Sequence, residues 1–127
     1  MARGRLWVDD TMDIVITVPD TKKEGIEKLI EFYKNQSPMD ELFFRVPFLP
    51  KKCEVGDLCF IVSNNAVIGS HIIEEMRFVS DGEASKLSDG NWTEGFYIIR
   101  SAVSFCVNHY RDKIETKGFR GFRYRWW

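Results

Sequence analysis

The chain ends in a segment where arginine alternates with aromatic residues, and these side chains are the ones most suited to binding chemistry. Residues 119–126 read Phe-Arg-Gly-Phe-Arg-Tyr-Arg-Trp, and further basic residues precede them. A guanidinium group pairs with phosphate and stacks on bases, and an exposed ring adds about 1–3 kcal/mol of stacking per base. The segment therefore predicts a surface that binds RNA or DNA and comprises Arg111, Lys117, Arg120, Arg123 and Arg125.

The same alternation also fits an ordinary β-strand. Phe122, Tyr124 and Trp126 fall on one face, with Arg123 and Arg125 on the other. A period of two is typical of a strand, and it places the three rings on the core side. The arginines then either face a ligand or keep an edge strand in solvent.

Charge is distributed unevenly along the chain. The net charge of the 127 residues is −1, which predicts no general attraction to nucleic acid or membrane. Residues 1–110 hold twelve Lys and Arg against seventeen Asp and Glu, whereas residues 111–127 hold six against two. The chain is thus a mildly acidic body with a basic C-terminal segment, which is either a binding surface or a solvated strand edge.

Two residues outside the C-terminal segment are further candidates for the nucleic-acid site. Trp92 is the one aromatic residue in the polar stretch 80–93. It either forms a wall of a pocket for a flipped or modified base, or anchors the loop on the sheet. Arg45 lies close to prolines and either binds phosphate in such a pocket or has a structural role. A loop of this length is often functional.

The cysteines and histidines form no recognisable metal-binding pattern. Cys53, Cys59 and Cys106 contain no Cys-x-x-Cys pair, and the two histidines complete no ligand spacing. Cys59 and Cys106 lie in apolar runs and are expected to be buried and unreactive, and His71 is expected in the core. The sequence thus predicts no metal, no cofactor and no catalytic residue, and its unpaired cysteines favour a cytoplasmic location.

The length and the hydropathy pattern indicate one domain over residues 1–127, with residues 1–12 as an N-terminal extension. No apolar run reaches the roughly 18 residues that a membrane span needs. Residues 1–7 lack the apolar region of a signal peptide. We therefore expect no membrane partner.

The clearest structural signal is a hairpin over residues 56–73. An apolar run over residues 58–62 is typical of a buried strand. Asn64 and Asn65 suit a type I′ turn, because Asn tolerates positive φ better than most residues. Gly69 in the return strand predicts a bulge, a bend or a close backbone approach.

A strand over residues 13–18, followed by a helix, is the second well-defined feature. Pro19 ends the strand because proline cannot donate to the ladder. Thr21 and Glu24 match a capping box, which predicts that the helix begins at Thr21. One face of this helix is apolar at helical spacing and is expected to pack on the sheet; it comprises Ile26, Leu29, Ile30 and Tyr33.

The remaining elements are shorter. Prolines limit residues 42–46 to an edge strand or a loop, residues 74–79 prolong the hairpin, and residues 80–93 form a surface loop. Residues 95–100 and 102–107 form two strands, or one strand bent near Ser101. With the final strand, the pattern predicts an α+β fold: a small curved mixed sheet or pseudo-barrel of five to seven strands with one main helix.

Taken in order, these features resemble the PUA-like superfamily, particularly its ASCH and EVE branches. The resemblance covers about residues 13–126 and rests on four features: Arg45 after the helix, Gly56-Asp57 opening a strand, the strand segment Val67-Ile68-Gly69, and the Lys-Gly-Phe-Arg-Gly-Phe end at residues 117–122. It implies a PUA-like pseudo-barrel with a basic pocket that binds RNA or a modified nucleobase.

Two other functions remain open. The resemblance also implies an ASCH-like amidohydrolase acting on modified nucleosides, although the Gly-x-Lys-x-x-Glu-x-Arg motif common in ASCH proteins is absent. A lysine base in such an enzyme requires a pKa lowered by burial, and the candidate groups are Thr21, Lys22, Lys23 and Glu74. The other possibility is a protein-interaction or inhibitor domain, whose acidic residues around the long loop are Asp81, Glu83, Asp89 and Glu94.

Overall fold

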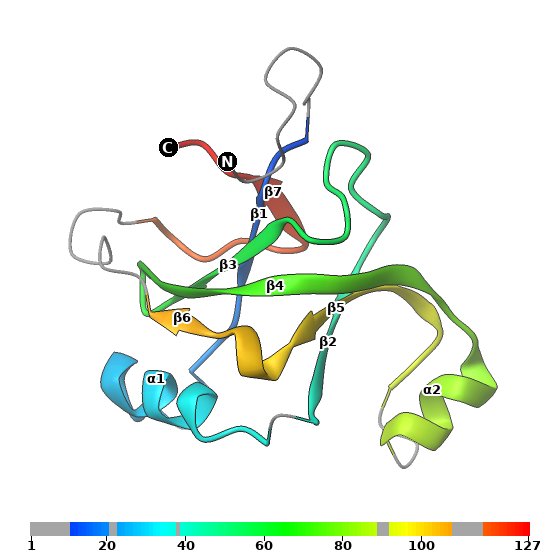
Figure 1. The fold of residues 1–127 in the computed structure, drawn as a ribbon, viewed down its shortest axis with the longest axis horizontal. Helices are drawn as coiled ribbons and strands as arrows, with labels where there is room; N and C mark the ends of the chain where they lie inside the picture. Colours follow the sequence, from blue (N-terminus) through cyan, green and yellow to red (C-terminus); the bar gives the residue numbers. More distant parts are fainter. Residues whose placement is uncertain (1–10, 21–22, 38, 89–91, 108–115) are drawn as a thin grey trace.

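The structure is a computed structural model that describes residues 11–20, 23–37, 39–88, 92–107 and 116–127. It confirms an α+β fold built on a curved mixed sheet (Figure 1). In chain order the elements are β1 (Ile14–Thr17), α1 (Ile26–Lys34), β2 (Glu41–Val46), β3 (Leu58–Ser63), β4 (Ala66–Val79), α2 (Asp81–Ser88), β5 (Gly95–Ser101), a 3-10 turn (Ala102–Ser104), β6 (Cys106–Val107) and β7 (Phe122–Tyr124).

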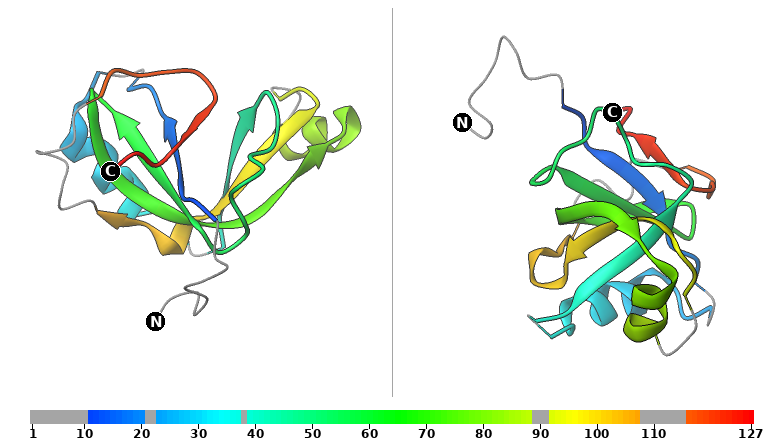
Figure 2. Two further views of the ribbon diagram at one scale, coloured as in Figure 1. Left: turned by 90° about the horizontal axis from the view of Figure 1, so that it is seen from above. Right: turned by 90° about the vertical axis from the view of Figure 1, so that its right-hand side faces the viewer.

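The strands are ordered β2-β5-β4-β3-β1-β7, and β6 pairs separately with β4. β1 and β3 are parallel, and the other pairs are antiparallel. Seen from above, the sheet folds into a V whose two arms share the long strand β4 (Figure 2). Among the described residues no strand pairing joins β2 to β7, so the sheet is open rather than a closed barrel.

The two ends of the V nevertheless approach each other after β2. The rings of Phe48 and Phe122 meet edge to face with centroids 5.5 Å apart. A Cβ placed on Gly121 would lie 3.2 Å from Cδ of Pro47, and Gly121 has a positive φ of 68°. Side-chain packing therefore brings the β2 end of the sheet to the β7 end without hydrogen bonds between the strands.

The predicted hairpin is confirmed as β3 and β4. Asn64 and Asn65 have φ values of 53° and 62°, as a type I′ turn requires. At Gly69 two of the expected features occur together. The pairing shifts after Ile61, which leaves Ile68 as the extra residue of a bulge. A Cβ on Gly69 would lie 2.5 Å from the Phe105 ring, so glycine permits a close approach.

Helix α1 presents the predicted apolar face, with Ile30 and Tyr33 buried. Its predicted start at Thr21 is wrong: the helix begins at Ile26, after Gly25 with a φ of 93°. The carboxylate of Asp20 accepts hydrogen bonds from the backbone N–H of Glu24 and Gly25 at 3.1 and 2.7 Å. These bonds, that of Gly25 foremost, lower the pKa of Asp20. A carboxylate before the helix thus replaces the expected capping box.

Two predicted segments differ from the structure. The stretch expected to be a loop over residues 80–93 contains α2, which buries Ala84 against Val79, Tyr97 and Ile99. Burial of Ala84 and the pairing of Glu83 with Arg77 of β4 are tertiary contacts that stabilise a helix whose polar composition suggested a loop. The expected strand over residues 102–107 is a 3-10 turn followed by the two-residue β6. The strand β5 therefore ends at the bend near Ser101.

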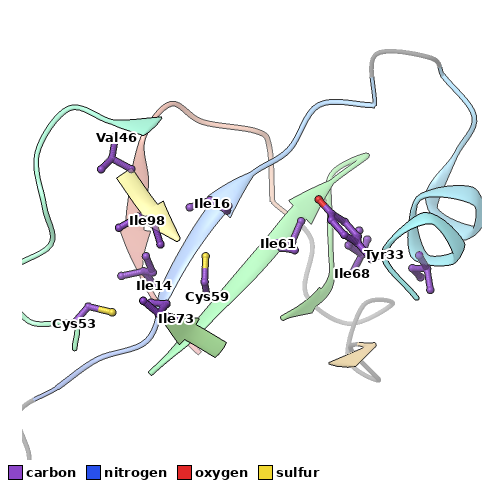
Figure 3. Close-up of a cluster of buried hydrophobic side chains, with 11 residues drawn as sticks. Ile14, Ile16, Tyr33, Val46, Cys53, Cys59, Ile61, Ile68, Ile73 and Ile98 are labelled. Carbon is purple, nitrogen blue, oxygen red and sulfur yellow. The ribbon is translucent and has the colours of Figure 1, made fainter. Parts of the chain in front are cut away.

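Among the described residues, buried apolar side chains form three clusters. The largest lies between the strands and α1, where Tyr33 reaches toward Ile68 of β4 (Figure 3). The second covers the opposite face of β1 and β3 and contains Val15, Phe60, Val62 and Val67, with Phe119 and Trp127 packed on it. The third lies between β5 and α2. Because both faces of β1 are covered, all of Ile14, Val15 and Ile16 are fully buried.

Candidate nucleic-acid interface

The C-terminal segment is attached to the sheet through β7, which pairs with β1 in antiparallel register. Phe122 and Tyr124 pack on the main core as predicted, and the Tyr124 hydroxyl accepts a hydrogen bond from the Lys52 backbone N–H at 3.0 Å. The prediction for Trp126 is wrong, since its side chain is 47% exposed. The strand ends at Tyr124, and Trp127 instead covers Phe60, with ring centroids 5.1 Å apart.

Two arginines of this segment lie over aromatic rings. The guanidinium carbon of Arg123 lies 4.4 Å from the centroid of Phe119. That of Arg125 lies 4.9 Å from the Phe60 centroid, and its Nη1 forms an ion pair with Asp13 at 3.3 Å. The contacts of Arg125 are therefore made within the fold rather than offered to a ligand. Arg123 is exposed, and its stacked guanidinium retains hydrogen-bonding edges for a ligand.

The exposed side chains around Phe119 form what we call the C-terminal cationic surface: Lys117, Arg120, Arg123 and Trp126. Phe119 contacts both Arg123 and Trp126, the latter with ring centroids 6.5 Å apart. Residues 116–127 contain four basic side chains and no acidic one. The surface thus combines positive charge with an exposed indole, held on a segment that is itself anchored by Trp127 and Arg125.

The structure does not bring the other candidates to this surface. Arg45 lies on β2, and its Nε and Nη2 both donate to the backbone oxygen of Glu94 at 3.2 Å. Trp92 packs on Phe43 and Tyr97, with ring centroids 4.9 and 5.8 Å apart. Both lie on the β2–β5 arm of the sheet, whereas the cationic surface lies along β1. Arg111 falls outside the described residues.

The groups considered for catalysis are not assembled into a site in the part of the chain that the structure describes. Lys23 and Glu74 are both exposed, while Thr21 and Lys22 lie outside the described residues. Cys106 is exposed rather than buried as predicted, whereas its neighbours Phe105 and Val107 pack on the main core. Of the acidic residues, Glu83 forms a bidentate pair with Arg77 of β4.

Sequence reasoning missed a buried polar group on the α1 side of the sheet. Arg100 of β5 is only 4% exposed, and its Nη1 lies 3.5 Å from Nδ1 of the fully buried His71. The His71 ring contacts Tyr33 and Phe105, with centroids 5.0 and 5.2 Å apart. Burial, and secondly the positive charge of Arg100, lowers the pKa of His71 to about 3. The signal was an arginine directly after the apolar run of residues 96–99.

Comparison with known proteins gives no match. No protein-family model matches the chain, and neither a search of curated proteins nor a search of solved structures finds a significant relative. Within the described residues no helix is long and apolar enough to cross a membrane.

Proposed function

We propose that this protein binds nucleic acid through the C-terminal cationic surface. The observation that carries the proposal is the guanidinium of Arg123 stacked on Phe119 beside the exposed ring of Trp126. Arg123 offers donors to phosphate, and Trp126 offers a face on which an unpaired base can stack. Lys117 and Arg120 add two cations within the same short segment.

This arrangement favours single strands over duplexes. A base can stack on Trp126 only when it is not held between neighbouring bases of a duplex. The indole and three cations make a small contact, so we expect weak binding that depends strongly on salt. RNA and single-stranded DNA share both the phosphates and the base faces, and the binding experiment distinguishes them.

The test is fluorescence anisotropy of labelled single- and double-stranded RNA and DNA, titrated with the protein at low salt. We expect single strands to bind more tightly than duplexes. Arg120→Ala combined with Arg123→Ala should weaken binding to every sequence, and Trp126→Ala should weaken single-strand binding most. A matched control, Lys28→Ala with Lys34→Ala, removes two exposed charges from α1 and should leave binding unchanged. Equal losses in both double variants would contradict the proposal.

A narrower form of the proposal follows the resemblance to PUA-like domains: the protein reads a modified base. Arg45 and Trp92 would then form a second site on the β2–β5 arm, away from the cationic surface. Trp92 packs on Phe43 and Tyr97 and is only partly buried, so part of this residue remains accessible to solvent. Oligonucleotides that differ by a single modified base, compared in wild type and Trp92→Ala, test this form. Equal affinity of the wild-type protein for all of these oligonucleotides would contradict this narrower form of the proposal.

A further inference from the structure

The buried Arg100 side chain has an unusual set of neighbours. Its residue is 4% exposed, and it lies on β5 opposite Ile73 of β4, on the side of the sheet that α1 covers. The groups that face it are the imidazole of His71, the phenol of Tyr33 and the thiol of Cys59. No carboxylate pairs with it among the residues that the structure describes.

All three neighbouring groups are uncharged near neutral pH. The low pKa of His71 keeps its ring neutral, and burial raises the pKa of the Cys59 thiol to about 12. Burial also raises the pKa of Tyr33 above its ordinary value. Arginine cannot lose its proton in a protein, so its charge persists there. The carboxylate of Asp13, which acts on the neighbouring Cys59 thiol, pairs with Arg125 and forms no ion pair with Arg100. A buried charge is costly unless it is paired, which makes an anionic partner strongly favourable.

Two hydrogen-bond donors in this cluster also lack partners. Nε of Arg100 is buried with no hydrogen-bond partner within the described parts of the chain. The same is true of Nε2 of His71. Because Nδ1 of His71 faces the Nη1 donor of Arg100, it acts as the acceptor, and the proton of the neutral ring is then on Nε2. The cluster therefore has donors and positive charge in excess.

We propose that Arg100 and His71 form a buried binding site for a small oxyanion. An oxyanion supplies both missing features at the guanidinium, since its negative charge pairs with that group and an oxygen accepts from the unpartnered Nε–H of Arg100. Phosphate and the carboxylate of a small organic ligand share this chemistry. The aromatic contacts of Tyr33 and Phe105 enclose the imidazole and lower the local polarity, which strengthens the ion pair.

Thermal unfolding of the full chain tests the site. The midpoint is measured in increasing phosphate, and separately in increasing acetate, against chloride at matched ionic strength. Wild type should show a midpoint that rises with one or both oxyanions, because a ligand that binds the folded state stabilises it. Whether phosphate or acetate gives the larger rise identifies the class of ligand. No rise above chloride in either series would overturn the proposal.

Two variants separate specific binding from general salt effects. Arg100→Met replaces the buried charge with an apolar chain, so it should fold stably and lose the oxyanion response. Lys117→Ala with Arg120→Ala should keep the response, which makes this test independent of the nucleic-acid surface. An equal response in Arg100→Met and wild type would show that the oxyanion acts elsewhere.

A direct measurement on wild type covers the case in which Arg100→Met does not fold. The ring signals of His71 are followed by nuclear magnetic resonance during titration with phosphate and with acetate. Binding at the site should shift the His71 signals and saturate, while those of the second histidine, His109, serve as the internal comparison. Unmoved His71 signals in both titrations would overturn the site.

Discussion

At the scale of residues, the arginines of this chain divide by what surrounds them. Arg77 pairs with Glu75 and Glu83, and Arg125 pairs with Asp13, so both stabilise the fold. Arg123 stacks on a ring but faces solvent, and Arg100 is buried beside a neutral histidine. The binding roles proposed for Arg123 and Arg100 follow from these neighbours, which the sequence alone does not reveal.

The buried histidine makes a prediction about pH. The pKa of His71 falls from 6.5 to about 3 on folding, so below pH 6.5 the unfolded chain binds a proton that the folded chain does not. The stabilising effect is complete above pH 6.5. As the pH is lowered from 6.5 toward about 3, the free energy of unfolding falls by up to about 1.4 kcal/mol per pH unit. Chemical denaturation across this range should show a shallower slope in His71→Leu. Parallel slopes in the two proteins would contradict the buried, neutral imidazole.

At the scale of elements, local sequence signals predicted some parts well and others not. The Asn64-Asn65 turn and the apolar face of α1 follow from backbone preference and helical spacing, which act within a few residues. Helix α2 and the outward turn of Trp126 depend on contacts between distant segments. The sequence identified the arginine-rich segment as a candidate surface. The end of β7 at Tyr124 determines which of its side chains face solvent, and the sequence did not predict where that strand ends.

The strand β4 provides a paired prediction. Gly69→Ala should lower the free energy of unfolding by about 1–3 kcal/mol, as overpacking does, because the new methyl group would lie 2.5 Å from the Phe105 ring. The control is Gly82→Ala in α2, where nothing lies within 4 Å of the added Cβ. That variant should be more stable by about 0.5–1 kcal/mol through helix propensity. Urea denaturation measures both, and an unchanged Gly69→Ala would show that the close approach is absent.

At the scale of the whole molecule, the C-terminal segment has two tasks. Its inner side covers the second face of β1 and β3 through Phe119 and Trp127, and Phe122 meets Phe48 at the end of the V. Its outer side carries the cationic surface. Anchoring through these partly buried rings holds Arg123 and Trp126 in place, so less ordering entropy opposes binding.

The two adjacent tryptophans test this division of tasks. Trp127→Ala should destabilise the fold by about 1–3 kcal/mol, because it removes a partly buried ring and uncovers Phe60. Trp126→Ala should cost less than Trp127→Ala, about 1 kcal/mol or below, since the residue is 47% exposed and its ring meets those of Phe119 and Trp127 only edge to face. Thermal and chemical denaturation of both variants give the comparison. A larger loss of stability in Trp126→Ala than in Trp127→Ala would contradict the assignment of Trp127 to the inner side and Trp126 to the outer side.

The most direct test of the central claim is the salt dependence of single-strand binding. Lys117, Arg120 and Arg123 can neutralise about three phosphates, so the slope of log K against log salt should be about −2. Lys117→Ala with Arg120→Ala should bring it to about −0.7. Trp126→Ala should weaken binding without altering the slope, because stacking releases no counterions. Binding that is absent at low salt, or a slope that is the same in wild type and the double variant, would contradict the claim.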